Sequence, residues 1–407
     1  MRHLLALAAL PLLAAGCNGS TDKSMAAENP DSAIGTPQAG SSSSSGPQNA
    51  AQMSKVAKLP FDVETVADLD EPWAMTFLGA GEALITEKDG RLLHWTQNGG
   101  TQQVSGTPKV DYGGQGGLGD VVLAPDFAQS GMVYLSWVEA GDGDTRGAVV
   151  GRAKLNRTGA APSLDNLQIV WRQAPKVTGR GHFSHRIAFS PDGKYMFISS
   201  GERQKQDPAQ DRSNNLGSIV RLYPDGSVPE DNPFYDEGGT TAQIWSYGHR
   251  NTLGLAFSPN GQLWNHEMGP KGGDEVNLIK RGANYGWPVR SYGDNYDGKP
   301  IPDHSADDGF TKPKVYWTPV ISPAGMIFYT GSLFPEWQGS ILMGGLSSKS
   351  LALINVNDQE ARQETWFDMG TRIREVEQAP DGSVWLLEDG GKSAQGRVMR
   401  LTPKSTS

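Results

Sequence analysis

A short turn motif recurs four times along this chain, each time shortly before an apolar run. It reads Leu123-Ala-Pro-Asp-Phe127, Phe189-Ser-Pro-Asp-Gly193, Phe257-Ser-Pro-Asn-Gly261 and Gln378-Ala-Pro-Asp-Gly382. Proline presets the first corner of a tight turn, and Asp, Asn or Gly accept the next one. An apolar residue, such a turn and a following strand make one hairpin. Hairpins repeated along a chain are typical of the blades of a β-propeller.

Short apolar or alternating runs lie between turn signals and are predicted to be strands, at 83–86, 132–137, 195–199, 340–343 and 384–387. No long segment shows the period of a helix. The 51 glycines and 26 prolines among 407 residues suit a turn-rich all-β protein. At about 40–50 residues per blade, six blades fit into the segment that we assign to the folded domain, 56–405. The sequence therefore predicts an all-β, six-bladed β-propeller, with two all-β domains that share a turn as the alternative.

The N-terminus has the pattern of an export signal. Arg2 and His3 precede an apolar run, from Leu4 to Ala15, that is too short to span a bilayer. The run ends in Leu13-Ala-Ala-Gly-Cys17, which resembles a bacterial lipoprotein signal in which the cysteine is acylated. A cleaved soluble signal is the alternative. We expect a signal peptide at 1–17 and lipidation of Cys17 as the only membrane contact. This places the protein in the cell envelope of a Gram-negative bacterium, on the outer membrane and facing the periplasm.

Composition narrows the remaining possibilities. Residues 18–55 are mainly Ser, Gly, Ala, Pro, Gln and Asn, which predicts a disordered linker. The net charge of −9 argues against nucleic acid as a partner, because phosphate binding needs a basic surface. Cys17 is the single cysteine, so no intramolecular disulfide can form.

Two glycine-containing segments carry side chains suited to ligand chemistry. In Gly113-Gly-Gln-Gly-Gly-Leu118 the backbone can approach a ligand closely, and Gln115 offers a donor and an acceptor, although such a segment is often only a loop. His182 and His185 precede a predicted strand, and histidine is a natural general base near neutral pH. They should point to opposite sides of an extended chain, so one can be functional and the other structural. A zinc site is disfavoured because no cysteine lies nearby.

Arginines form the next group of candidates. Arg250 presents a planar fork that matches a carboxylate, and Asn251 adds amide contacts, with an interblade salt bridge as the alternative. Arg372 and Arg374 are two apart and should share one face of a strand. Two adjacent guanidinium groups are unfavourable without an anion between them, although a solvated edge strand is also possible. A propeller could bring these groups to one end of its channel, where a ligand with several carboxylates would fit.

The segment from Glu267 to Tyr285 is rich in oxygen ligands. It offers backbone carbonyls at Gly269 and Pro270 and the carboxylate of Glu275 in an irregular, glycine-rich loop. Hard cations such as Ca²⁺ prefer oxygen ligands of this kind. The loop lacks the spacing of an EF-hand, so the residues alone give only a candidate calcium site.

Several motifs occur together in a fixed order between about Glu71 and Pro403. They are Pro72-Trp73, Gly114-Gln-Gly-Gly-Leu118, Gly217-Ser-Ile-Val-Arg221, Trp245-Ser-Tyr-Gly-His-Arg-Asn251, Gly269-Pro270, Gly272-Gly-Asp-Glu275, Asn284-Tyr-Gly-Trp-Pro288, Phe334-Pro-Glu-Trp337 and Arg372-Ile-Arg374. This set resembles the soluble sugar dehydrogenases that depend on pyrroloquinoline quinone (PQQ), and among them the aldose sugar dehydrogenases. The resemblance implies a six-bladed propeller with the quinone over the mouth of its channel.

The resemblance also implies a role for individual residues. His182 would be the general base. The cofactor-binding residues would be Gln115, Arg250, Asn251, Tyr296, Gly345, Leu346, Ser347, Arg372 and Arg374. The carbonyls of Gly269 and Pro270 would hold a catalytic calcium ion, and Glu275 and Tyr285 a second, structural one. The implied reaction is PQQ- and calcium-dependent oxidation of an aldose at C1 to the lactone. Hydride would pass to the quinone and electrons to an external acceptor.

The chain departs from the family pattern at three places. Gly345-Leu-Ser347 stands where the family usually has Ala-Leu-Lys or Ser-Leu-Lys, so a lysine that would touch the quinone is absent and Lys349 is a candidate substitute. Arg250-Asn-Thr-Leu-Gly254 replaces Arg-Asn-Pro-Gln-Gly, and His185 replaces a small residue. Two alternatives therefore stay open. One is a non-catalytic propeller that binds a sugar or a protein, and the other is a calcium-dependent lactonase, which the paired arginines disfavour.

Overall fold

The computed structural model describes residues 46–391 and 395–404. Cys17, the predicted signal peptide and the predicted linker up to residue 45 lie outside the described residues. Six sheets of four or five strands and one two-stranded ribbon make up the described part. The longest α-helix there, α1 (Phe127–Ser130), is a single turn. No helix of this part of the chain is long and apolar enough to cross a membrane.

Each of the six sheets is a blade. The four main strands pair in chain order in the first five blades, and in the last blade β2 pairs with β28. The first two blades are β3 (Pro72–Gly79), β4 (Glu82–Glu87), β5 (Leu92–Thr96) and β6 (Gly100–Val104), and β7 (Leu118–Leu123), β8 (Met132–Ala140), β9 (Thr145–Asn156) and β10 (Ser163–Arg172). The next two are β12 (Ser184–Phe189), β13 (Met196–Ser200), β14 (Ser218–Leu222) and β15 (Ile244–Tyr247), and β16 (Thr252–Phe257), β17 (Leu263–Glu267), β19 (Asp274–Leu278) and β21 (Val315–Trp317). The last two are β22 (Pro323–Phe328), β23 (Ile341–Gly345), β24 (Ser350–Asn357) and β25 (Glu360–Asp368), and β26 (Ile373–Gln378), β27 (Val384–Glu388), β28 (Gln395–Pro403) and β2 (Phe61–Asp70).

Smaller elements complete the chain. The additional strands are β1 (Gln48–Asn49), β11 (Val177–Thr178), β18 (Lys271–Gly272) and β20 (Gly293–Asp294), the last two forming the ribbon. The 3-10 helices are η1 (Ala50–Gln52), η2 (Asp207–Gln210), η3 (Tyr235–Glu237), η4 (Thr241–Gln243) and η5 (Pro335–Trp337).

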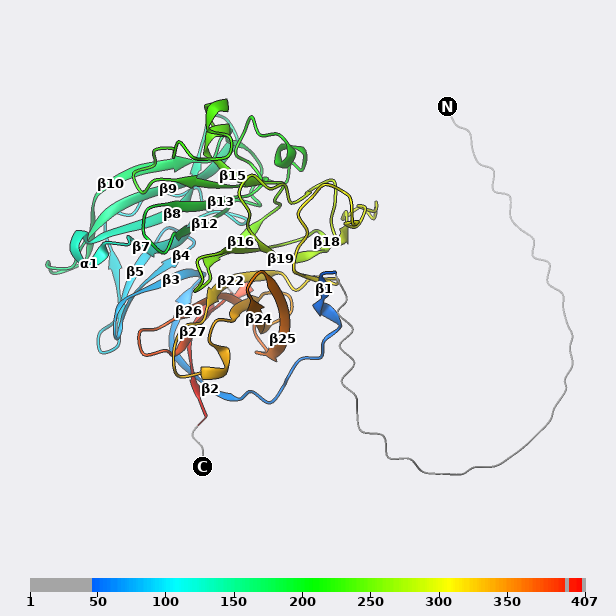
Figure 1. Ribbon diagram of the computed structural model, residues 1–407. Coiled ribbons are helices and arrows are strands. Elements are labelled where there is room, and N and C mark those ends of the chain that lie inside the picture. The colour runs from blue at the N-terminus through cyan, green and yellow to red at the C-terminus, as the bar shows by residue number, and fades with distance from the viewer. Residues whose placement is uncertain (1–45, 392–394, 405–407) are drawn as a thin grey trace, which may run out of the picture. The chain divides into compact units, whose positions relative to one another are not determined.

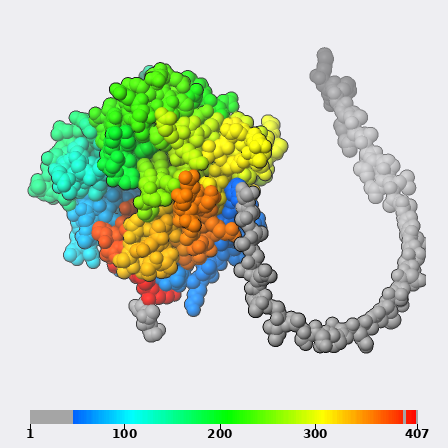
Figure 2. Space-filling view, in the orientation of Figure 1, coloured from blue at the N-terminus to red at the C-terminus, as the bar shows by residue number. Residues whose placement is uncertain are grey.

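The first strands of the blades form a closed ring in the order β3, β7, β12, β16, β22 and β26, with β26 again touching β3 (Figure 1). The surface colours likewise follow the chain order around the described part of the molecule (Figure 2). In the last blade β2, from near the N-terminus, pairs with β28, from near the C-terminus. This pairing closes the ring, and the predicted six-bladed propeller is confirmed.

The recurring turn motif joins the first two strands of four blades. In three of them the glycine N–H donates to the carbonyl three residues earlier, with N···O distances of 2.7 Å at Gly193, 2.9 Å at Gly261 and 2.9 Å at Gly382. These glycines have φ between 70° and 84°, a conformation that favours glycine. The five strands predicted from the sequence are found as β4, β8, β13, β23 and β27, with ends shifted by up to three residues.

The end of the predicted linker is ordered, so its boundary at residue 55 is wrong. Within 46–55, β1 pairs in parallel with β21, and η1 follows it. The Ala50 side chain is fully buried, and Met53 packs against the same apolar cluster, between the fourth and fifth blades. Apolar burial of these two side chains opposes the entropy that otherwise keeps such a polar segment disordered.

Apolar clusters fill the spaces between neighbouring blades, whereas the centre of the ring is polar. Arg186 on β12 donates to Asp120 on β7 at 3.2 Å, to the Leu253 carbonyl on β16 at 2.9 Å, and to Glu375 on β26. All three ionisable side chains, of Arg186, Asp120 and Glu375, are buried. Burial is the main cause that raises the pKa of Glu375 to about 7, against the opposing charge of Arg186. This cluster ties four first strands together.

Candidate functional site

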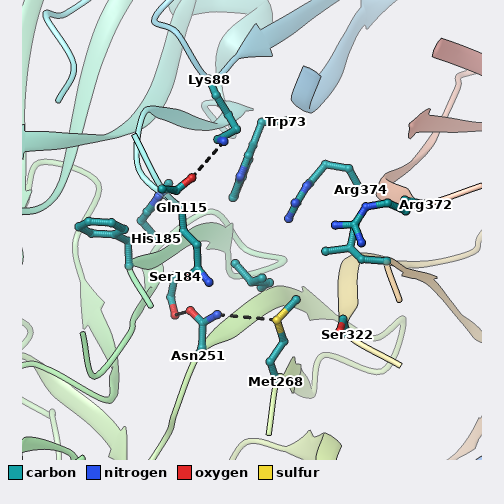
Figure 3. Close-up of a pocket in the computed structure, with 14 residues that line it drawn as sticks. Trp73, Lys88, Gln115, Ser184, His185, Asn251, Met268, Ser322, Arg372 and Arg374 are labelled. Carbon is teal, nitrogen blue, oxygen red and sulfur yellow. Dashed lines mark hydrogen bonds between the residues drawn. The ribbon is translucent and has the colours of Figure 1, made fainter. Parts of the chain in front are cut away.

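Two neighbouring cavities contain most of the predicted site residues. The first, here called the cationic cavity, has a volume of about 280 Å³ and is shown in Figure 3. It is lined by Trp73, Lys88, Gly114, Gln115, Phe183, Ser184, His185, Asn251, Leu253, Met268, Ser322, Leu346, Arg372 and Arg374. The second, here called the histidine cavity, has about 410 Å³. It is lined by His182, Glu202, Gln204, Gln206, Arg250, Pro270, Trp287, Asn295, Tyr296, Asp297 and Lys299.

Arg372 and Arg374 reach the cationic cavity together, as their spacing predicts (Figure 3). The protein itself places an anion between them. Asp389, just after β27, accepts from Arg372 Nε at 3.0 Å and from Arg374 Nε at 3.1 Å. Burial alone would raise the pKa of the Asp389 carboxyl, but the two guanidinium groups hold it well below its usual range. One carboxylate cannot neutralise two guanidinium groups, so the pair retains a net positive charge.

A stack of planar groups forms an aromatic wall of the cationic cavity. The Trp73 indole lies parallel to the His185 ring, with centroids 5.3 Å apart and an interplanar angle of 16°. The Arg186 guanidinium lies 4.1 Å from the Trp73 centroid. His185 Nδ1 is 2.7 Å from Ser136 Oγ. Burial lowers the pKa of His185 to about 3, so this ring is neutral and serves as packing.

His182 and Glu202 form the central pair of the histidine cavity. His182 Nδ1 contacts a Glu202 carboxylate oxygen, and the other carboxylate oxygen accepts from the Gln206 backbone N–H at 2.6 Å. Burial lowers the pKa of His182, an effect that the hydrogen bond to Glu202 opposes and the charge of Arg250 reinforces. The ring is therefore neutral near pH 7. Glu202 fixes its orientation and leaves Nε2 without a partner among the described residues.

The backbone around this pair adopts unusual conformations. His182, Ser184 and His185 have φ of 48°, 60° and 64°, and Arg203 and Gln204 have φ of 63° and 59°. Residues other than glycine seldom adopt such angles, and these strained conformations concentrate at functional sites. The predicted extended chain across the two histidines is therefore wrong. The prediction that they have different surroundings is nevertheless correct, because His182 lines the histidine cavity and His185 is packed beside Trp73.

Side chains near the boundary connect the two cavities. Gln115 lines the cationic cavity, and its Oε1 accepts from the His182 backbone N–H at 2.7 Å. Arg250 lines the histidine cavity, while the adjacent Asn251 lines the cationic one. The predicted residues thus converge on one end of the ring, but they are divided between two compartments.

Arg250 contacts carbonyl groups rather than a carboxylate. Its Nη1 donates to the carbonyls of Met268 at 2.9 Å and Gly269 at 2.7 Å, and its Nη2 lies 3.3 Å from the Tyr296 hydroxyl. Its buried Nε has no hydrogen-bond partner among the described residues. The interblade salt bridge considered from the sequence is therefore not formed by this side chain. Tyr296 is 74% exposed and forms the outer rim of the cavity.

The loop after β17 is held by a buried aspartate. Asp274 Oδ1 accepts from the Gly269 N–H at 2.8 Å, and Oδ2 accepts from the N–H groups of Ile321 and Ser322 at 2.7 Å each. Burial raises its pKa to about 6, although these hydrogen bonds oppose the shift. Pro270 lines the histidine cavity, whereas the Gly269 carbonyl is engaged by Arg250.

The second predicted metal position is only partly assembled. Glu275 lies opposite Glu267 in the pairing of β19 with β17, and the Asn277 amide contacts both carboxylates, at 3.4 Å and 3.3 Å. Burial and the charge of Glu267 raise the pKa of Glu275. The Tyr285 hydroxyl instead donates to the Leu278 carbonyl at 2.6 Å. Among the described residues, no group of three or more His, Cys, Asp or Glu side chains could hold a metal ion.

The segment Gly345-Leu-Ser347 contributes a single lining residue. Leu346 lines the cationic cavity, whereas Gly345 is buried in β23 and Ser347 is exposed. Lys349 is also exposed and is absent from the lining of either cavity. Lys88, Glu202 and Asp389 are site residues that the sequence motifs did not indicate. Glu202 and Asp389 each follow the end of a predicted strand. Their shared position at strand ends was the sequence signal that could have marked them as site residues.

Comparison with known proteins places the chain among sugar dehydrogenases. Residues 69–400 match the family model described as Glucose / Sorbosone dehydrogenase. The chain is 40% identical over 353 residues to aldose sugar dehydrogenase YliI of Escherichia coli (strain K12), covering 84% of this chain and 93% of the relative. The crystal structure of the soluble aldose sugar dehydrogenase of Escherichia coli in its apo-form matches with a TM-score of 0.80 at 40% identity, covering 84% of this chain and 100% of that one. The PQQ-bound aldose sugar dehydrogenase of Streptomyces coelicolor matches with a TM-score of 0.70 at 28% identity, covering 86% and 99%.

Proposed function

Because the chain belongs to the glucose/sorbosone dehydrogenase family, we propose that it oxidises aldose sugars at C1 with PQQ as its cofactor. The observation that supports this most is the position of the His182–Glu202 pair beside the cationic cavity, linked through Gln115. A base oriented by a carboxylate next to a cavity for an anion is the arrangement that such an oxidation needs.

The residues of the cationic cavity fit a tricarboxylic quinone. Three cationic side chains line the cavity, and no Asp or Glu is among its lining residues. Trp73 lines the cavity as part of its aromatic wall, and the buried Arg250 Nε lacks an acceptor among the described residues. Arg372, Arg374, Asn251 and Gln115 would hold the group through charge-assisted and amide hydrogen bonds.

In the proposed reaction the residues of this chain bind the sugar and move a proton. When bound, PQQ would supply the two-electron oxidant for C1 of the sugar, and an external acceptor would reoxidise it. His182 would take the proton of the C1 hydroxyl at Nε2, and Glu202 would stabilise the resulting imidazolium. Tyr296, Asn295 and Lys299 at the rim would contact other parts of the sugar.

Calcium belongs to the same proposal, but the protein supplies an incomplete set of ligands for it. At the first position the Gly269 carbonyl already accepts from Arg250, and both oxygens of Asp274 accept from backbone N–H groups. Ca²⁺ takes six to eight oxygens, so an ion there would need oxygens of the quinone as well. At the second position the paired carboxylates of Glu267 and Glu275 favour a cation, but Glu267 already contacts His249 Nδ1 and accepts from the Arg250 backbone N–H.

Dye reduction by the apoprotein tests the function. Protein is given PQQ, Ca²⁺, both or neither, together with a panel of aldoses and an artificial acceptor. We expect reduction only with PQQ, and quinone uptake that is much stronger with Ca²⁺ than without it. Quinone uptake without reduction of the dye would instead indicate the non-catalytic propeller. Hydrolysis of lactones with Ca²⁺ alone would indicate the lactonase.

We further propose that Cys17 anchors the protein to a membrane of the cell envelope. The support is the sequence pattern around Cys17, which lies outside the described residues. The variant Cys17→Ser should move the protein from the membrane fraction to the soluble fraction without changing the dye-reduction rate per molecule. A variant that still sediments with membranes would overturn the anchor.

A further inference from the structure

The cationic cavity contains a lysine that the sequence analysis did not select. Lys88 lies in the turn between β4 and β5 and lines the cavity together with Gln115, Arg372 and Arg374. Figure 3 shows its side chain reaching toward the cavity beside Trp73. Its side chain is 18% exposed, so the ammonium group is largely shielded from bulk solvent.

A small group of neighbours holds Lys88 in place. Its Nζ donates to the Gly114 carbonyl at 3.2 Å and to Glu71 Oε1 at 3.3 Å. The Tyr112 hydroxyl donates to the other oxygen of Glu71, and Nζ lies 5.7 Å from the centroid of the Tyr112 ring. An ammonium group has three N–H donors, and these two contacts use two of them. Among the described residues the third donor has no acceptor, so it is available to a ligand.

The chain has no lysine at position 347, where the family has one, and the nearby Lys349 cannot replace it as a ligand of the quinone. Ser347 stands where a lysine is expected, and its side chain is exposed. Lys349 is exposed as well and lines neither cavity. Among the described residues, Lys88 from the first blade is therefore the lysine that lines the cavity, while both lining arginines come from the last blade.

Cationic side chains from two different blades line the cavity, which favours an anionic ligand. Asp389 compensates part of the charge of Arg372 and Arg374, and Glu71 compensates Lys88 from behind. Neither acid is among the lining residues, so the groups that face a ligand are cationic. A ligand with three carboxylates can then contact the arginines and the lysine at once.

We propose that Lys88 binds a carboxylate of the quinone and takes the place of the lysine that is missing at Ser347. This inference rests on the proposed function, because it takes PQQ as the ligand. The third donor of Nζ makes a charge-assisted hydrogen bond to the carboxylate, and Glu71 with Gly114 keeps the ammonium group oriented.

Quinone titration of the apoprotein tests the inference without any measurement of activity. PQQ is added in the presence of Ca²⁺, and binding is followed by quenching of tryptophan fluorescence and by equilibrium dialysis. We expect Lys88→Gln to weaken binding about tenfold, the loss of one charge-assisted contact, and Lys88→Arg to recover most of it. Lys349→Gln is the matched control and should bind like the wild type.

A second variant gives the opposite expectation. Glu71→Gln removes the compensating charge but keeps an amide oxygen that can accept from Lys88 Nζ, so the ammonium group stays oriented. Quinone binding should then tighten several-fold, which a general loss of structure could not do. Thermal unfolding of each variant checks that it is folded. Unchanged affinity in Lys88→Gln, or weaker binding in Glu71→Gln with an unchanged melting temperature, would overturn the role of Lys88 and leave the proposed function intact. A wild-type protein that takes up no PQQ would overturn both.

Discussion

The cationic cavity and the histidine cavity lie at the same end of the ring but differ in their balance of charge. The first is lined by Lys88, Arg372 and Arg374 and by no acidic residue. The lining of the second has both signs, with Glu202 and Asp297 as well as Arg250 and Lys299. An excess of cations suits the binding of an anion, whereas a balanced set with a neutral histidine suits proton transfer beside a neutral, polar substrate.

The two histidines show the same contrast within four residues of sequence. His182 has a carboxylate partner and a free ring nitrogen in a cavity, and His185 is stacked on Trp73 with a hydroxyl partner. Burial lowers the pKa of both, but only His182 has a group placed to stabilise its protonated form. Both rings line a cavity, so a candidate base is recognised by its carboxylate partner. Residue type and burial are not sufficient.

Removal of the His182 imidazole is expected to have the largest effect. His182→Ala should lower kcat for dye reduction about a thousandfold, because a general base contributes about 10²–10⁴-fold to the rate. Quinone binding should stay within about twofold of the wild type, since binding belongs to the other cavity. Stopped-flow reduction and quinone titration of the same preparations measure both. Loss of quinone binding together with the rate would show that the two cavities are not functionally distinct.

A smaller effect is expected for the partner of the base. Glu202→Gln should lower kcat about a hundredfold, because the ring then loses the anion that stabilises its protonated form. The hydrogen bond that His182 donates to Glu202 raises the pKa of His182, so its loss lowers that pKa further. In the wild type, kcat/KM should stay constant with falling pH to below 6.5, the usual pKa of histidine, and then decline. In the variant this decline should begin at a lower pH. A decline that moved to higher pH would contradict the assigned pair.

The fold could be predicted largely because its signals are local. Each Pro-Asp-Gly or Pro-Asn-Gly turn determines the geometry of its own hairpin, and the glycine N–H bonds at Gly193, Gly261 and Gly382 are nearly identical. Order in residues 46–55 could not be predicted in this way. It depends on the pairing of β1 with β21, more than 260 residues away, and on burial of Ala50 between blades.

Only the part of the site that depends on the two-residue period of a strand could be predicted from the sequence. The spacing of Arg372 and Arg374 correctly predicts that they share a face, because strand geometry alone determines it. Asp389 supplies the anion between them from a different strand end, and no local pattern links it to the arginines. Lys88 reaches the cavity in the same way, from a turn in the first blade. Side chains brought together by ring closure require the three-dimensional structure.

The smallest expected effect is on the cationic cavity and leaves the chemistry unchanged. Arg372→Met removes one of the two guanidinium groups that share Asp389, and its hydrocarbon chain keeps much of the volume. Quinone affinity should fall about tenfold, or about 1.4 kcal/mol, because Arg374 and Asp389 then form a neutral pair. With saturating quinone, kcat should stay within about twofold, since His182 and Glu202 are untouched.

Arg400→Met is the matched control. Arg400 also pairs with an aspartate, Asp381, at 2.8 Å, but it lines neither cavity, so its loss should leave quinone binding unchanged. A large fall in kcat for Arg372→Met under saturating quinone would mean that the cationic cavity contributes to the chemistry as well as to binding.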